Sequence, residues 1–487
     1  MINKFQKVIS WIILICVAIY TSIVFIQMWQ NYFGHYLQVD AFKNVVFLVI
    51  ALLLTIGIGY FLMRISTDDA RLNAMILITL LALFAVMAIF WINSLPPEQV
   101  SDFHKFWFTA PDALNGKSIY AYDNDYFAKW SYQSGFLVYV MAVIKIFGYH
   151  IAAIQYLNVI YQVVILLLTY KLVVKIFDNV KMARLSVFSL MINLDWFALN
   201  SQADNQYLGT MFFLLTFYLI LLDKYWTYLL AGITLTLGAI VRPIGPVIIA
   251  GIVVFAIFYM LLKDNKFHWS ALGKLAIVLG LYLVLFNGAS ALVKSSGLSE
   301  YGLSNRDSEW KFVIGLSHRN YGQYDQGLVN QFNLKDSRAK MSKQEHQVIK
   351  QNITDLNKNN QWADLLWQKN AIMWAKESNA ISFTGINVNH SAYTIKWMTY
   401  AGYVASIILI IFSFIGSLRL FKFNFNNGIF LLLLPFMAYV IVQLLIEVQG
   451  RYRIEFIPIL SILGGVGLFT ICNWIKSKWS GRNDRSV

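Results

Sequence analysis

Charged residues are scarce in this chain: Asp, Glu, Lys and Arg make up only 13% of its 487 residues, about half of their share in soluble domains. Cysteine is nearly absent, and Cys16 and Cys472 both lie in apolar runs where neither a disulfide framework nor a metal-ligand spacing can be read. The chain also lacks HExxH, GxSxG and P-loop motifs and a GxGxxG motif in a strand-to-helix context. No metal and no cofactor is therefore expected.

Hydrophobic residues are abundant instead. They make up 58% of the chain, and the mean hydropathy is +0.57. The sequence therefore predicts an all-α integral membrane protein that crosses the cell membrane many times. Apolar runs that reach or approach the roughly 20 residues of a membrane-crossing helix lie near residues 8–29, 44–63, 74–94, 151–173, 185–199, 207–222, 226–241, 246–262, 272–293, 401–418, 428–446 and 456–475.

Basic residues outnumber acidic ones, and the net charge is +14. They are distributed over the short loops between the apolar runs rather than along one face, which is the positive-inside pattern of a membrane protein. No nucleic-acid partner is expected. The first apolar run follows Lys4 and Lys7, as in a signal peptide, but it is too long and no small-residue cleavage site follows it.

One apolar segment is ambiguous, "GFLVYVMAVIKIFG" at 135–148, which is short for a span and contains Lys145. If this segment lies along the membrane surface, the short basic loops all fall on one side, the cytoplasmic one. If it crosses, every later loop changes sides and the pattern is lost. We therefore expect about 12 spanning helices, cytoplasmic termini and a juxtamembrane helix at 135–148.

This topology divides the chain into five parts. Three N-terminal spans (1–94) precede a first outer loop with juxtamembrane helices (95–150), core spans (151–293), an extracytoplasmic loop (294–395) and C-terminal spans (396–487). The extracytoplasmic loop contains "WADLLWQKNAIMWAKES", whose apolar residues recur at helical spacing. We expect an amphipathic helix there, on the membrane or on the other loops.

The first outer loop contains "SDFHKFWF" (101–108), in which Asp102 is the candidate catalytic residue. A carboxylate just outside a span, in an aromatic segment that partly desolvates it, is suited to general-base catalysis. The alternative is a helix N-cap at Ser101 or Asp102. His104 and Lys105 of the same segment are candidate substrate-binding residues, although a lone histidine is more often a satisfied polar group.

Two further candidates lie at the outer ends of core spans. Asp204 belongs to the short connection "NSQADNQ" (200–206), where a turn or helix cap competes with a site role. Arg242 follows the run 226–241 and precedes a proline, so a permanent cation lies at the outer interface. It either snorkels along that interface or holds a phosphate through its fork of donors.

The segment "EVQGRYR" (447–453) supplies the last candidates. Arg451 and Arg453 flank Tyr452 shortly after Glu447, on the outer side, where the positive-inside pattern disfavours arginine. An anionic ligand would account for both arginines.

The order of these features resembles the GT-C superfamily of polytopic membrane glycosyltransferases. The matching segments are the "SDF" motif, the juxtamembrane helix ending in "IFG", the "LNSQADNQYLGT" hairpin, "LAGITLTLGAIVRP" and the late "GRYRIEF". The resemblance covers roughly residues 95–475 and is greatest to the branch of the dolichyl-phosphate-mannose protein mannosyltransferases and the bacterial lipid A aminoarabinose transferases. The chain departs from that pattern at 131–135, where "SYQSG" replaces a proline motif, and in having three spans before the first loop.

The resemblance implies a GT-C-type bundle and an inverting transferase that moves a sugar from a polyprenyl-phosphate donor to an extracytoplasmic envelope acceptor, which is a glycopolymer, a lipid or a protein. It implies that Asp102 is the general base, that Asp204 is the second acidic position, and that Arg242, Arg451 and Tyr452 lie near the donor phosphate.

Two alternative functions stay open. A flippase for lipid-linked oligosaccharides, or another transporter, would place charges near the middle of its spans. A ligase or polymerase of envelope polysaccharide would also use outer arginines.

Overall fold

A computed structural model of the chain describes residues 2–34, 40–119, 126–263, 266–304, 309–333, 336–422 and 425–483. Nearly all of the secondary structure in these ranges is helical. The strands found there are β1 (Leu262–Lys263) and β2 (Lys266–Phe267), which pair antiparallel in a small hairpin. Helices satisfy their own backbone hydrogen bonds inside a bilayer, and the predicted all-α class is confirmed.

Seven helices in the described part of the chain are long and apolar enough to cross a membrane, as expected for a multi-pass membrane protein. They are α1 (Ile2–Gly34), α2 (Ala41–Arg64), α3 (Ala70–Asn93), α7 (Ile151–Phe177), α13 (Ser270–Ser295), α18 (Ala392–Arg419) and α20 (Ile457–Asn483).

The other apolar runs form bent or shorter helices. Helix α8 (Val180–Met191) meets α9 (Leu194–Phe197) and the turn after it at an angle of 69°, and this pair is long enough to form one broken span. In the described residues, seven helices, or eight if the bent pair counts as one span, are therefore long and apolar enough to cross a membrane. The shorter apolar helices are α6 (Ser134–Phe147), α10 (Gln206–Leu221), α11 (Tyr225–Val241), α12 (Gly245–Phe255) and α19 (Gly428–Gln443).

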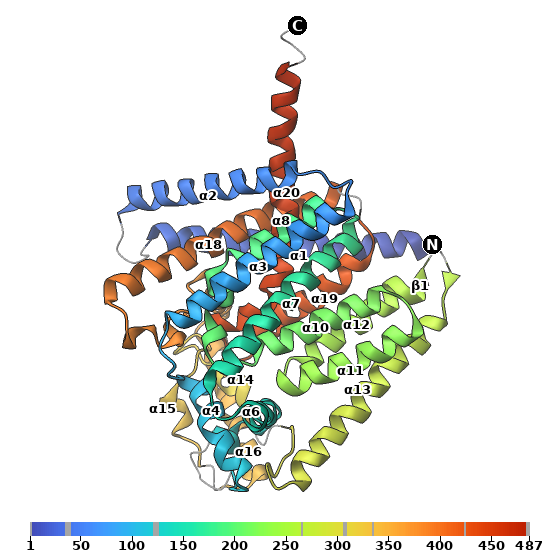
Figure 1. The fold of residues 1–487 in the computed structure, drawn as a ribbon. Helices are drawn as coiled ribbons and strands as arrows, with labels where there is room; N and C mark the ends of the chain where they lie inside the picture. Colours follow the sequence, from blue (N-terminus) through green and yellow to red (C-terminus); the bar gives the residue numbers. More distant parts are fainter. Residues whose placement is uncertain are drawn as a thin grey trace.

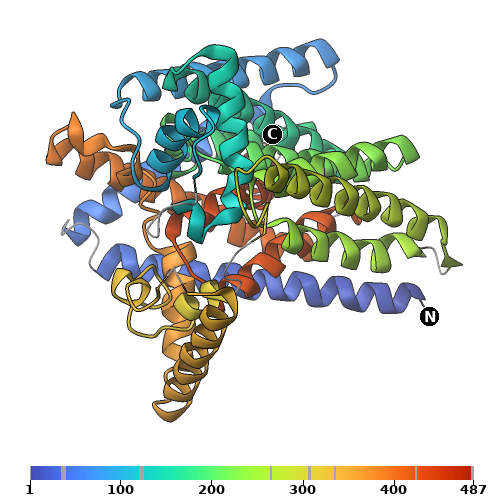
Figure 2. The same ribbon diagram turned by 90° about the horizontal axis from the view of Figure 1, so that it is seen from below.

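Several helices from the regions between the apolar runs gather at one end of the bundle, in the lower part of Figure 1. They include α4 (Ser101–Leu114), α14 (Trp310–Gly315), α15 (Gln326–Val329) and α16 (Arg338–Lys358). Helix α6 is seen end-on in Figure 1, across the diagonal direction of the long helices, and it packs against α4. Figure 2 shows that α16 projects away from the bundle.

The basic loops lie together elsewhere in the bundle. The Arg184 guanidinium donates to the backbone carbonyls of Ile65 at 3.0 Å and Ser66 at 3.1 Å, which joins the start of α8 to the loop after α2. The Asn426 side chain donates to the carbonyl of Lys175 at 2.6 Å, which joins the loop after α18 to the end of α7. These contacts place three loops that the sequence assigns to one side of the membrane at one end of the molecule.

The helix predicted from "WADLLWQKNAIMWAKES" forms α17 (Trp362–Asn370) and continues as the π-helix η5 (Ala371–Ala375). Its apolar face is buried in the bundle. The ring of Trp374 contacts those of Tyr20, at a centroid distance of 5.7 Å, and Phe436, at 5.5 Å. The segment therefore ties the long region between α13 and α18 to the transmembrane helices.

Candidate functional site

The connection 200–206 organises the candidate site through its amide side chains. The backbone N–H of Val100 donates to the side-chain oxygen of Gln202 at 3.0 Å, which fixes the chain just before α4. The side-chain amide of Gln206 donates to the carbonyl of Arg451 at 2.9 Å, in the 3-10 helix η9 (Gly450–Phe456). Because both glutamines are buried and hydrogen-bonded, the connection holds α4 and η9 in fixed relation to each other.

Local backbone chemistry positions Arg242. The following Pro243 disfavours a helical conformation at the residue before it, and Arg242 accordingly ends α11 with an extended backbone, φ −132° and ψ 117°. Gly209 of α10 leaves room for the arginine, since a Cβ there would lie 2.8 Å from the Arg242 Cβ. The guanidinium is ion-paired through Nε with Glu455 and lies over the ring of Tyr452, at 5.4 Å from its centroid.

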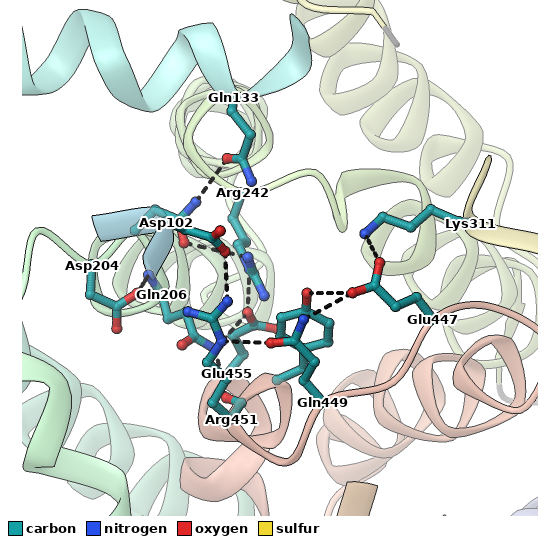
Figure 3. A network of polar contacts seen from close by, with 12 residues as sticks. Asp102, Gln133, Asp204, Gln206, Arg242, Lys311, Glu447, Gln449, Arg451 and Glu455 are labelled. Atoms are coloured by element: carbon teal, nitrogen blue, oxygen red, sulfur yellow. Dashed lines mark hydrogen bonds and ion pairs between the residues drawn. The ribbon is translucent and has the colours of Figure 1, made fainter. Parts of the chain in front are cut away.

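Arg451 is joined to the candidate base. Its NH2 group donates to Asp102 Oδ2 at 2.6 Å, and its Nε donates to the side-chain oxygen of Gln449 at 2.9 Å. The guanidinium lies over the rings of Phe383 and Phe103, at 4.6 and 5.2 Å from their centroids. The arginine is buried, whereas the Asp102 side chain keeps 35% of its surface exposed. The ion pair in Figure 3 thus holds the carboxylate in place, while part of its surface stays exposed.

The N-cap alternative for Ser101 or Asp102 is wrong. Helix α4 begins at Ser101, Val100 occupies the cap position, and no side chain makes a capping hydrogen bond. Ser101 itself has a φ of 52°, in the left-handed region, which costs an ordinary residue about 1–2 kcal/mol. Strained residues of this kind cluster at functional sites.

A further ion pair lies beside that of Arg451 and Asp102. Lys311, at the start of α14, donates to Glu447 Oε2 at 2.6 Å and lies over the ring of Trp130, at 4.8 Å from its centroid. Burial alone would lower the pKa of Lys311, but the Glu447 carboxylate raises it above its ordinary value, so the lysine is charged. Gln449 donates to the other oxygen of Glu447 at 2.9 Å, which links the two ion pairs in Figure 3.

Asp204 is a buried carboxyl with one incompletely satisfied oxygen. Its Oδ1 accepts a hydrogen bond from the backbone N–H of Gln206 at 3.1 Å, whereas Oδ2 is buried and has no partner among the described residues. Burial raises the pKa of Asp204 to about 7, against the opposing effects of that hydrogen bond and of Arg242 and Arg451. The residue therefore changes charge near neutral pH.

These groups line a cavity of about 380 Å³, which we call the arginine cavity. Its charged lining residues are Asp102, Asp204, Arg242, Lys311, Glu447 and Arg451. The opposite wall is apolar and comes from α11 to α13 and the segment after α13; it includes Ile240, Pro246, Tyr282, Phe286 and Leu303.

A second cavity, of about 450 Å³, adjoins the first, and we call it the amide cavity. The two share a border of Asp102, Tyr132, Gln133, Lys311, Glu447 and Tyr452. The residues that line the amide cavity alone are all uncharged: Ser101, Tyr126, Trp130, Gln323, Tyr324, Ser378, Asn379, Phe383, Gln449 and Gly450. Asp102 therefore faces both spaces.

Most of the residues predicted from the sequence come together here, because Asp102, Asp204, Arg242, Glu447, Arg451 and Tyr452 all line the arginine cavity. Arg453, His104 and Lys105 line neither cavity. Arg453 is buried and donates to the carbonyl of Lys376 at 2.7 Å and to Asp195 at 3.3 Å. His104 and Lys105 are exposed on α4, and the His104 ring stacks on Phe108 at 4.1 Å.

Sequence reasoning missed several residues of the site. Lys311 is one of them: it pairs with Glu447, which was predicted, across 136 positions, and no local pattern connects the two. Tyr132 and Gln133 come from "SYQSG", the segment in which the chain departs from the GT-C pattern that the sequence resembles, yet both lie on the border of the two cavities. Glu455 could have been found, because an ionisable residue at the start of an apolar run is a functional candidate by default.

Comparison with known proteins adds no family: no protein-family model matches the chain, and a search of curated proteins finds no match. No three His, Cys, Asp or Glu side chains come together as a metal site in the described ranges. The interpretation of the site therefore rests on its own geometry.

Proposed function

We propose that this protein is a membrane glycosyltransferase of the GT-C type, which transfers a sugar from a polyprenyl-phosphate donor to an acceptor hydroxyl with inversion at the anomeric carbon. One observation carries the proposal: Asp102 lies on the border between a cavity lined by two arginines and an apolar wall and a second cavity whose lining away from the border is uncharged and polar. A transferase needs this arrangement, because its base must reach the acceptor while the leaving phosphate is held elsewhere.

The chemistry of the arginine cavity suits the donor. Nε and NH2 of Arg451 have partners, and Nε of Arg242 has one, but Arg451 NH1 and Arg242 NH2 have no hydrogen-bond partner among the described residues. These free nitrogens, one on each arginine, can donate charge-assisted hydrogen bonds to phosphate oxygens.

The apolar wall of the arginine cavity suits the lipid. Tyr282 and Phe286 line it from α13, and only 6% of the most apolar stretch of that helix is buried in the protein. Helix α13 thus borders the bilayer on one side and the cavity on the other, so a prenyl chain in the membrane can reach its phosphate site without crossing a polar surface.

The residues of the site can account for each bond and proton of the proposed reaction. The acceptor oxygen bonds to the anomeric carbon on the face opposite the phosphate, and the bond from that carbon to the phosphate oxygen breaks. The acceptor proton goes to Asp102, whose Oδ1 has no partner in the described part of the chain while Oδ2 is held by Arg451. The polyprenyl phosphate leaves with the electron pair, and Arg242 and Arg451 stabilise its growing charge.

The proposal includes the finer topology predicted from the sequence. Twelve spans would comprise the seven long helices, the bent pair α8–α9 and the shorter helices α10, α11, α12 and α19, with α6 at the membrane surface. Both termini are then cytoplasmic, and residues 95–134 and 294–395 are extracytoplasmic.

Single cysteines at 117, 178 and 330 in a cysteine-free background test this topology. Labelling of 117 and 330 but not of 178 from outside intact cells is expected, and labelling of 178 would contradict it.

The function is tested with purified protein in liposomes that carry a polyprenyl-monophosphate sugar labelled in the sugar. We expect release of polyprenyl phosphate and transfer of label to a cell-envelope extract, with an inverted anomeric configuration by NMR. Arg242→Gln should abolish the release, whereas Arg453→Gln, a buried arginine outside both cavities, should not. Movement of intact labelled lipid across the bilayer without release would instead identify a flippase. Transfer of preassembled polymer, but not of a single sugar, would identify a ligase or polymerase.

A further inference from the structure

The amide cavity has a chemistry of its own, and we infer that it binds an uncharged saccharide as the acceptor. This inference rests on the proposed function, because it takes Asp102 to be the base that receives the acceptor's proton. It narrows the acceptor from any envelope hydroxyl to the hydroxyl of a neutral glycan.

Charge is the first reason. None of the residues that line the amide cavity alone is charged. The charged residues on its border are already paired: Asp102 with Arg451 at 2.6 Å, and Lys311 with Glu447 at 2.6 Å. An anionic or cationic acceptor would therefore meet charged groups only at the border, and most of the cavity would offer its charge no ion-pair partner.

The kind of apolar surface is the second reason. The apolar surface of the amide cavity is aromatic, from Tyr126, Trp130, Tyr132, Tyr324, Phe383 and Tyr452, and no aliphatic side chain lines it. A sugar ring presents flat C–H faces that pack on aromatic rings, which supply contact area without requiring a charged partner. An acyl chain would favour aliphatic side chains, which line the arginine cavity at Ile240, Ile244 and Leu303.

Amide side chains supply the third reason. Gln133, Gln323, Asn379 and Gln449 all line the amide cavity. Each amide can donate and accept hydrogen bonds, which matches hydroxyl groups, since these also do both. Asn379 is exposed and has a φ of 59°, and no hydrogen bond of its side chain to the described residues is found. Its amide is therefore free for a ligand.

A peptide acceptor fits less well. Extended peptides are commonly held by main-chain pairing with an exposed strand edge. The strands in the described part of the chain are β1 and β2, whose residues line neither cavity. Side-chain amides and aromatic rings are the groups available, and these favour a saccharide.

The test is saturation-transfer-difference NMR on the full-length protein in lipid nanodiscs, without donor. The probes are uncharged trisaccharides of glucose, mannose, galactose and N-acetylglucosamine, with trigalacturonate and a Ser/Thr-rich peptide beside them. At least one neutral trisaccharide should give a signal. That signal should fall by about fivefold or more in Tyr324→Ala and drop clearly in Asn379→Gly, which keeps the left-handed backbone.

Control variants distinguish loss of binding from loss of folding. Tyr149→Ala removes a tyrosine outside both cavities that is 46% exposed, against 44% for Tyr324, and should keep the full signal. If Tyr324→Ala does not fold, Gln323→Ala takes its place, with the same expected loss. Equal signals in the cavity variants and in the protein itself would overturn the inference. So would the absence of a signal from every neutral trisaccharide, or stronger binding of trigalacturonate or the peptide.

Failure of this inference and failure of the proposed function are distinguishable. Arg242→Gln should abolish donor use but leave trisaccharide binding intact, because Arg242 does not line the amide cavity. Trisaccharide binding without any turnover of a lipid donor would refute the transferase proposal. Turnover of the lipid donor without trisaccharide binding would refute the saccharide inference alone.

Discussion

The arginine cavity and the amide cavity share a border but differ in chemistry on either side of it. The first adds two arginines, a buried carboxyl, three amide side chains and a mixed aliphatic and aromatic wall, and the second adds only aromatic, amide, hydroxyl and glycine residues. On the proposals made above, the first cavity would take a charged, lipid-borne donor and the second a neutral, hydrated acceptor. The two ligands would then meet only at the border, where Asp102 lies.

The largest effect is expected when a cation of the arginine cavity is removed. Arg242→Ala or Arg451→Ala should lower kcat/KM for the polyprenyl-phosphate donor by on the order of a hundredfold or more, because each change also leaves a carboxylate without its partner. Lysine at either position should recover only part of the loss, since a point charge cannot reproduce the guanidinium fork. Steady-state kinetics with varied donor measure both effects. Donor kinetics unchanged by both alanine variants would remove the arginines from the site.

A smaller effect is expected from pH through Asp204. Burial raises its pKa to about 7, so the carboxyl is neutral below that pH and negative above it. The donor is a phosphodiester whose charge is constant over this range. Its KM should therefore rise several-fold as pH increases through 7, because the new negative charge shares the arginine cavity with the phosphate. Asp204→Asn should flatten the profile. An unchanged profile in that variant would assign the titration to another group.

A separate effect, on stability rather than on turnover, is expected from Lys369, which packs beside the border of the two cavities. Lys369 is fully buried and donates to the carbonyls of Gly315 at 2.6 Å and Ile446 at 2.8 Å, which holds α14 against the loop that carries Glu447. Burial lowers the pKa of Lys369 from 10.5 to about 7, against the opposing effect of Glu447. Between these values the unfolded chain binds more protons than the folded one, so stability should increase as pH rises, by up to about 1.4 kcal/mol per pH unit.

Lys369→Met should remove that increase, and melting temperatures between pH 7 and 10 in detergent measure it. Lys350→Met, at an exposed position of α16, should leave the slope as it is. A slope that persists in Lys369→Met would show that another group titrates.

Much of this architecture is readable from the sequence, because apolar runs specify long helices directly. The convergence of Asp102, Arg242 and Arg451 was also predictable, since all three follow or precede apolar runs at ends assigned to one side. The sequence did not predict that the Arg453 side chain lies outside both cavities. It lies two residues after Arg451 in a 3-10 helix, whose three-residue turn points such neighbours in different directions. His104 and Lys105 also lie outside the cavities, because the turn of α4 places both residues on its exposed face.

Other features depend on contacts between distant segments. The border of the two cavities combines residues 102, 132–133, 311, 447 and 452, which four separate segments bring together. Only tertiary packing decides that Lys311 pairs with Glu447, and no periodicity or local motif encodes it. The twelve-span topology, the sugar donor and the inverting mechanism stay predictions.

The central claim is that Asp102 takes the acceptor's proton while the donor is held separately. It is tested by single-turnover transfer with Asp102→Asn, donor preloaded, and donor affinity measured in parallel. Asparagine keeps the size and polarity but cannot accept the proton, so the rate should fall by on the order of a hundredfold or more while donor affinity changes little. Near-normal turnover in the asparagine variant would contradict the account, and the base would then have to be sought at Asp204 or Glu447.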